Sequence, residues 1–296
     1  MKRGLRISFG IILLIFFGAY AYFSITGGPT AATVVPGASE SAQLPVSVTD
    51  APAPVSVDTT PVVAVETPAP TVEPTPDPNS PAGRAAALGL PTPPEIDVNS
   101  WEFTLVNGDH SIGEYAPEQL AYLDQTLTYT DVQTTPSDRI AVDARIADAL
   151  VAFGLGCKDA GLPVYLSSGY RSYKDQQANF IRVCNNNGVS DGKDSNGHYI
   201  TMPAGCSEHQ LALCCDITDI YRPIKNAEIE KTETFQWLKE HCAAFGFVVR
   251  FPSGKEDITN VMYEPFHFRY VGTEAANYMM QNDLVLEEFL ALYGVE

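Results

Sequence analysis

The pattern of hydrophobic and polar residues divides the 296-residue chain into three stretches. Residues 7–25 are almost wholly apolar, which is long enough to cross a bilayer. Residues 27–97 are mostly Pro, Thr, Ala and Val, and no aromatic residue lies between Phe23 and Trp101. From there on, apolar residues recur with the spacings of helices and strands. The pattern therefore predicts an N-terminal segment (1–26), a linker (27–97) and one folded domain (98–296).

The N-terminal segment is predicted to be a membrane anchor. Lys2, Arg3 and Arg6 precede the apolar stretch and no basic residue follows it closely, so we expect a single-pass protein whose folded domain is extracellular. Ala19 and Ala21 would form the cleavage site of a signal peptide, which is the alternative. The apolar stretch continues past Ala21, and this favours the uncleaved anchor.

The linker is predicted to be disordered. Its prolines block regular hydrogen bonding, and without aromatic side chains it cannot bury enough apolar surface to fold. Its length suits a spacer through a cell wall, and a disordered linker with no particular reach is the alternative.

Within the folded domain, the periodicities predict an alternation of helices and strands. We expect strands at 164–166, 213–219, 247–251 and 262–271, and helices at 139–160 (capped by Ser137), 172–187 and 234–242, with short helices from Thr273 and from about Leu286. The order lacks the rhythm of repeated strand–helix–strand units. It predicts an α+β fold with a small, mostly antiparallel sheet flanked by helices.

Charge and cysteine content narrow the functional classes. A formal net charge of −18 argues against a nucleic-acid partner, because phosphates require a basic surface. The six cysteines allow fifteen disulfide patterns, and none forms the CxxC pair of a cysteine-only zinc site. Cys214 and Cys215 are neighbours, so on a strand they should point to opposite faces and have different partners.

Two of the five histidines have a carboxylate nearby at the edge of a predicted strand. Catalytic zinc takes three nitrogen or oxygen ligands and keeps one position open for water. His209, Asp216 and His267 would supply the ligands, and Glu264 would remain free as a general base. Two histidines with purely structural roles and an aspartate that caps a turn would have the same spacing. The spacing alone therefore does not decide whether a zinc site is present.

The spacing of Glu264 and His267 is a geometric test of this hypothesis. Residues three apart on a regular strand face opposite sides, which would separate the two side chains. Pro265 favours a strand edge or a bulge, and a kink at that point would bring both into one cavity.

Three motifs in chain order resemble the VanY-type D-alanyl-D-alanine carboxypeptidases of the M15B group. They are SGYRS at 168–172, SEHQ at 207–210 with Asp216, and EPFHFRYVG at 264–272. The resemblance implies a metallopeptidase fold of the hedgehog and D-Ala-D-Ala peptidase type, with Zn²⁺ bound by His209, Asp216 and His267. It also implies that Glu264 acts as general base and that Arg171 steadies the substrate carbonyl. The expected substrates are the stem peptides of peptidoglycan.

By the same resemblance, Ser207 would support the site or contact the substrate, and Tyr170 and Gln177 would line the substrate cleft. The chain also departs from the family pattern: Ala212 replaces a glycine, Cys214-Cys215 replaces a small apolar pair, and Phe266 replaces a tryptophan. Competition of Cys214 or Cys215 for the metal is not expected, because Asp216 is intact. A disulfide between Cys184 and Cys206 would staple the loop before the site. An L,D-carboxypeptidase and a non-catalytic cell-wall binding module are the alternatives to D,D-carboxypeptidase activity.

Overall fold

The computed structural model describes residues 75–295, apart from 124–132, 135–139, 221, 223 and 224. The predicted membrane anchor, the first part of the linker and the predicted cap Ser137 lie outside these residues. In the described part of the chain, no helix combines the length and apolarity needed to cross a membrane.

The main sheet has five strands and is mostly antiparallel, as predicted. Its spatial order is β2 (Gln133–Thr134), β4 (Tyr165–Ser168), β5 (Cys214–Thr218), β7 (Glu264–Tyr270) and β6 (Phe247–Phe251). Only the β2–β4 pair among these is parallel. Two further strands, β1 (Leu120–Tyr122) and β3 (Ala141–Asp143), pair with each other in an antiparallel ribbon. The predicted α+β class is confirmed.

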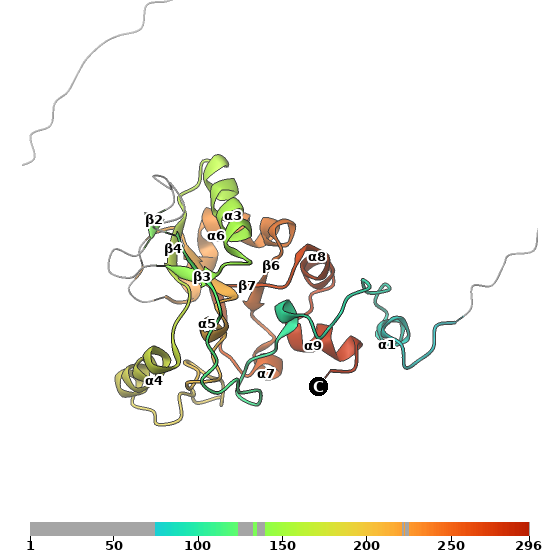
Figure 1. Ribbon diagram of the computed structural model, residues 1–296, viewed down its shortest axis with the longest axis horizontal. Helices are drawn as coiled ribbons and strands as arrows, with labels where there is room; N and C mark the ends of the chain where they lie inside the picture. The colour runs from blue at the N-terminus through green and yellow to red at the C-terminus, as the bar shows by residue number, and fades with distance from the viewer. Residues whose placement is uncertain (1–74, 124–132, 135–139, 221, 223–224, 296) are drawn as a thin grey trace, which may run out of the picture. The chain divides into compact units, whose positions relative to one another are not determined.

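The sheet separates two apolar cores. On one side, α3 (Ala147–Asp159) and α6 (Glu233–His241) cover it, and Phe153 stacks on Phe247 and meets Phe268 edge-on. The second core lies between the sheet and the C-terminal helices (Figure 1). Strand β6 serves both, because Phe247 lies in the first core and Val248 in the second, as a period of two requires.

Among the remaining helical elements of the described part of the chain, α4 is long and the others are short. They are α1 (Pro81–Ala87), α4 (Tyr173–Asn187), α5 (Glu208–Leu211), α7 (Glu256–Thr259), α8 (Thr273–Gln281) and α9 (Leu286–Leu292), with 3₁₀ turns η1 (Trp101–Phe103), η2 (Ala227–Lys231) and η3 (Cys242–Phe245). Helix α4 has the predicted bounds because Ser172 caps its first turn and Gly188, at φ 67°, ends it. The predicted helices from Thr273 and Leu286 are confirmed as α8 and α9.

The helix predicted over 139–160 starts too early. Strand β3 occupies its first residues, with Val142 paired to Ala121 of β1. The Asp143 carboxylate then accepts a hydrogen bond from the Arg145 amide, and this turn ends the strand before α3 begins. The apolar side chains of β3 fit both the periodicity of a strand and that of a helix. The sequence therefore could not show where β3 ends and α3 begins.

The predicted linker boundary at residue 97 is also wrong. Helix α1 lies within the predicted linker and packs on α9, with Ala85 buried in the second core and the Arg84 guanidinium donating to the Leu292 carbonyl at 3.1 Å (Figure 1). Farther along, the Tyr278 and Tyr293 hydroxyls donate to carbonyls of the proline-rich segment, at Pro91 and Pro94. This segment has no aromatic residue of its own, but it packs on those of α8 and α9.

Candidate metal centre

The pairing of β5 with β7 positions the first two site residues. Asp216 lies directly opposite His267 in the antiparallel register. Both side chains are buried, and both line a cavity beside the sheet. Cross-strand neighbours have side chains on the same face, so a carboxylate and an imidazole meet at this point.

His209 reaches the same cavity from α5, the short helix that precedes β5. Ala212 ends this helix at φ 62°, a left-handed conformation that glycine adopts at lower cost. The reversal turns the chain into β5 and leaves His209 beside Asp216. The backbone therefore explains why a glycine is customary at position 212 in the sequences that this chain resembles.

The two imidazoles are held by hydrogen bonds on the side away from Asp216. His209 Nδ1 lies 2.7 Å from the Gly169 carbonyl oxygen, and His267 Nε2 lies 3.2 Å from a Glu208 carboxylate oxygen. The other ring nitrogens face the aspartate, with His209 Nε2 at 3.5 Å and His267 Nδ1 at 3.2 Å from Asp216 Oδ1. Partners of this kind fix the ring orientation of metal-binding histidines.

The distances from the two ring nitrogens to Asp216 Oδ1 fit a zinc ion. Two ligand atoms that each lie about 2.1 Å from a tetrahedral zinc are about 3.4 Å from each other. Among the described residues, Asp216 Oδ1 is also buried without a hydrogen-bond partner. A buried carboxylate oxygen in this position is costly unless a cation or donor binds it. The residues present therefore fit the metal.

Asp216 is held in its ionised form. Burial acts to raise its pKa, but the ammonium group of Lys225 and the neighbouring His209 outweigh burial, and the pKa lies well below its usual range. Lys225 Nζ donates to Oδ2 at 2.8 Å, which leaves Oδ1 directed at the histidines. Lys225 was not identified from the sequence.

Glu264 lies in the same cavity because β7 is irregular at Pro265. The register with β6 shifts between Val249 and Phe251, which confirms the predicted bulge or kink. Glu264 Oε2 is consequently 3.7 Å from His267 Nδ1, although the two residues are three apart. Burial raises the pKa of Glu264 above its ordinary value.

Arg171 also lines the cavity. Its amide donates to the His209 carbonyl at 3.0 Å, and its guanidinium donates to the Gln176 side chain and, at 3.3 Å, to Ser168 Oγ. Ser207, the residue before α5, is buried and also lines the cavity.

The two candidate wall residues are placed differently. Tyr170 is half-buried and lines an adjoining groove that also includes Arg171. The Gln177 side chain is exposed and is not among the residues that line the cavity, so that choice is wrong. One position earlier on α4, Gln176 is buried there, because successive helical residues point about 100° apart.

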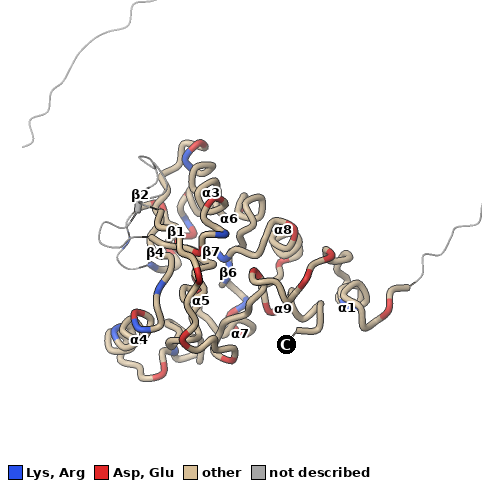
Figure 2. The backbone as a smooth tube through the Cα atoms, in the orientation of Figure 1, with Lys and Arg blue, Asp and Glu red and all other residues tan. Residues whose placement is uncertain are grey.

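Glu208 is a further site residue that sequence reasoning missed. Besides His267, its carboxylate accepts hydrogen bonds from Arg250 and Arg269, both at 2.7 Å. Arg250 also binds both carboxylate oxygens of Glu287. The basic positions on β6 and β7 can be followed in Figure 2. Its position directly before the candidate ligand His209 is the feature of the sequence that could have identified Glu208.

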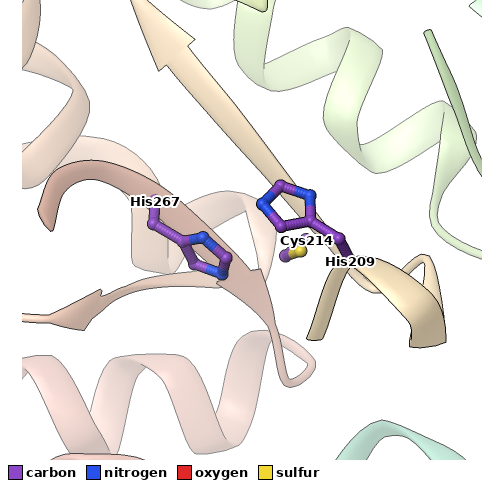
Figure 3. A group of neighbouring side chains, drawn as sticks. All are labelled: His209, Cys214 and His267. Atoms are coloured by element: carbon purple, nitrogen blue, oxygen red, sulfur yellow. The ribbon is translucent and has the colours of Figure 1, made fainter. Parts of the chain in front are cut away.

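The cysteine pair of β5 diverges as predicted. Cys215 lies in the first core, whereas the Cys214 sulfur lies between the imidazoles of His209 and His267 (Figure 3). Burial acts to raise the pKa of the Cys214 thiol, but the two histidines lower it to about 7. All six cysteines lie in the described part of the chain and all are free, so the suggested disulfide between Cys184 and Cys206 is wrong.

Comparison with known proteins gives consistent matches. Residues 139–273 match the VanY family, described as D-alanyl-D-alanine carboxypeptidase. YodJ of Bacillus subtilis strain 168 is 33% identical over 187 residues, covering 62% of this chain and 65% of YodJ. The chain thus spans just under two thirds of that relative.

Two solved structures are also similar. The LdcB LD-carboxypeptidase is 31% identical with a TM-score of 0.55, covering 67% of this chain and 92% of LdcB. A mutant of the vancomycin resistance D,D-pentapeptidase VanY in complex with Zn(II) is 29% identical with a TM-score of 0.50, covering 64% of this chain and 99% of that protein.

Proposed function

Because the chain belongs to the VanY family of D-alanyl-D-alanine carboxypeptidases, we propose that it removes the terminal D-alanine from peptidoglycan stem peptides with the aid of zinc. The observation that carries the proposal is the convergence of His209 Nε2, Asp216 Oδ1 and His267 Nδ1 in a cavity that Glu264 also lines. The similar VanY structure that contains Zn(II) supports the choice of metal.

In this proposal the ligands of the ion are His209, Asp216 and His267. Glu264 acts as general base and then as general acid. Bound zinc would lower the pKa of its water to about 7 and polarise the peptide carbonyl. Glu264 would accept the proton of that water and return it to the leaving amine. Burial raises the pKa of Glu264, which brings this carboxyl closer to the range in which it can both take up and release a proton.

Arg171 would stabilise charge on the substrate. Its guanidinium is tethered to Gln176 and Ser168, so it is already fixed when the substrate arrives. A preorganised donor of this type stabilises the oxygen on which negative charge develops. Ser207 lies in the same cavity and is a candidate contact for the peptide.

The test is product analysis by mass spectrometry with the full-length chain, a pentapeptide stem and a tetrapeptide stem, with and without a chelator. Chelator-sensitive loss of one D-alanine from the pentapeptide is the expected result. The Glu264→Ala variant should lose cleavage but retain zinc, and Glu240→Ala, at an exposed position on α6, is the matched control. Cleavage by Glu264→Ala at the wild-type rate would exclude the assignment of the base.

An L,D-carboxypeptidase is the second candidate, favoured by the similarity to LdcB. Cleavage of the tetrapeptide alone would select it. A non-catalytic wall-binding module would cleave neither stem, and the partly buried Glu264 beside the proposed ligand set argues against it.

We also propose that residues 7–25 anchor the protein, with its catalytic domain outside the cell. The support is the apolar stretch preceded by Lys2, Arg3 and Arg6. Membrane fractionation combined with protease treatment of intact cells tests it, and a full-length chain in the soluble fraction would exclude the anchor.

A further inference from the structure

We propose that Cys214 Sγ is a fourth protein ligand of the metal held by His209, Asp216 and His267, which gives this chain a centre with thiolate character. The inference rests on the proposed zinc site. It concerns a position at which this chain departs from the family pattern described above.

The register of the sheet places Cys214 at the site. Cys214 and Asp216 are two apart on β5, so their side chains share a face, and His267 is opposite Asp216 and diagonal to Cys214. The Cys214 sulfur and one ring nitrogen each of His209 and His267 lie within 4.8 Å of one another. Figure 3 shows the sulfur between the two rings. A strand, its neighbour and a helix thus bring three donors to one point.

The surroundings of Cys214 differ from those of other buried thiols in this chain. Cys215 Sγ and Cys242 Sγ each contact a backbone carbonyl oxygen, at 3.5 Å and 3.4 Å. Cys214 instead faces the imidazoles of His209 and His267. These groups are metal donors, and thiolate is a stronger donor to soft cations than carboxylate.

Cys214 would bind from the sheet side of the ion. Its side chain is fully buried and is not among those that line the cavity, whereas Asp216, His267 and Glu264 all line it. The cavity side therefore stays available for water and substrate beside Glu264, in the five-coordinate arrangement that zinc can adopt. When the metal–sulfur bond forms, the thiol proton is released to solvent.

One thiolate and one carboxylate would balance the two positive charges of the ion. A more neutral centre acidifies its bound water less, and the sulfur shifts metal preference toward softer cations such as Cd²⁺. The expected signature is thus spectroscopic and thermodynamic, and it can be read without measuring turnover.

The experiment replaces zinc by Co²⁺ in the reduced full-length chain, in Cys214→Ala and in Cys215→Ala. The visible d–d bands of Co²⁺ should appear in all three proteins, because His209, Asp216 and His267 remain. A sulfur-to-cobalt charge-transfer band in the near ultraviolet should appear in the wild type and in Cys215→Ala and should be lost in Cys214→Ala. Competition between Cd²⁺ and Zn²⁺ should show a preference for Cd²⁺ that falls by about tenfold or more in Cys214→Ala.

The outcomes separate the two proposals. Visible bands without a charge-transfer band in the wild type would overturn the role of Cys214 and leave the proposed metal site standing. Failure of the wild type to bind Co²⁺ would overturn both. Cys214→Ser keeps a polar atom at the position, so it provides a folded variant if Cys214→Ala fails to fold, and it should lack the charge-transfer band as well.

Discussion

Two buried clusters of charged side chains meet at His267, and they differ in how completely their polar atoms are paired. The arginine cluster, defined as Glu208, Arg250, Arg269 and Glu287, has donors and acceptors matched at 2.7–2.8 Å. The candidate metal centre, defined as His209, Asp216 and His267, keeps a buried aspartate oxygen that has no hydrogen-bond partner in the described part of the chain.

The difference separates a structural role from a functional one. A fully paired buried network rigidifies a fold, whereas a buried oxygen without a partner is costly and persists where a ligand binds it. Glu208 belongs to the arginine cluster but also binds His267 Nε2. The arginine cluster therefore helps to hold the His267 ring of the candidate metal centre in place. The following four predictions test this division, beginning with the largest expected effect.

Asp216→Asn should strongly weaken metal binding at the candidate centre. The amide retains the shape of the side chain but is a poor metal ligand, so we expect zinc content to fall and activity to drop by more than about a hundredfold, the upper end for loss of an outer-shell partner. Metal analysis and stem-peptide cleavage measure the two effects. Asp219→Asn is the control, because Asp219 pairs with Arg222 and does not line the cavity. Normal zinc binding by Asp216→Asn would contradict the ligand assignment.

Arg250→Met should be the most destabilising change in the arginine cluster. It leaves the buried Glu208 and the partly buried Glu287 without their shared partner, and breaking such a pair typically costs about 3–5 kcal/mol. Denaturant unfolding measures the loss. Lys231→Met removes an exposed pair with Glu228 and should leave the unfolding midpoint unchanged. Equal stability of the two variants would mean that the cluster does not hold the fold.

Glu208→Gln should weaken metal binding without removing a ligand. The amide no longer fixes His267 with a charge, and loss of such an outer partner costs about 10–100-fold in metal affinity. Competition with a chelator measures the zinc affinity, and NMR of the His267 ring reports its tautomer. Glu287→Gln is the control, because Glu287 also pairs with Arg250 but does not contact His267. The zinc affinity of this variant should match that of the wild type. A loss of the same size in both variants would show a general effect on stability instead.

The sequence predicted the convergence of these residues because the candidate ligands lie in local patterns. His209 lies shortly before an apolar strand that contains Asp216, and Pro265 marks the irregularity that brings Glu264 beside His267. Glu208 and Lys225 were missed because their partners are distant in the chain, and only the folded register pairs Glu208 with Arg250 and Arg269. Gln177 was chosen wrongly because the sequence does not show which of two adjacent glutamines on α4 faces the cavity. The structure shows that Gln176 does.

For the fold as well, features encoded locally in the sequence were predicted and those that depend on distant contacts were not. Element types were recovered where periodicity or a cap was strong, as in α4. The boundary of α3 was missed because a short buried strand and a helical turn present the same apolar residues. Helix α1 was assigned to the linker because its stability comes from α9, through contacts such as that of Arg84 with Leu292, and composition does not report such packing.

Acid should destabilise the arginine cluster, and this is the smallest expected effect. Burial acts to raise the pKa of Glu208, but Arg250 and Arg269 outweigh burial and hold the pKa well below the ordinary 4.5. The contribution to stability is therefore complete above about pH 4.5. It is lost as the pH falls toward the folded-state pKa, because the unfolded chain takes up the proton first.

Thermal unfolding between pH 7 and pH 3 measures the decline, and comparison with Glu208→Gln assigns it. That variant has no carboxyl to protonate at this position, so the stability difference between wild type and variant should narrow as the pH falls below about 4.5. Asp216 also has a depressed pKa, held down by Lys225, so part of the acid sensitivity should remain in Glu208→Gln. A constant difference across the range would show that Glu208 titrates alike in the folded and unfolded chains, and the arginines would then not be its electrostatic partners.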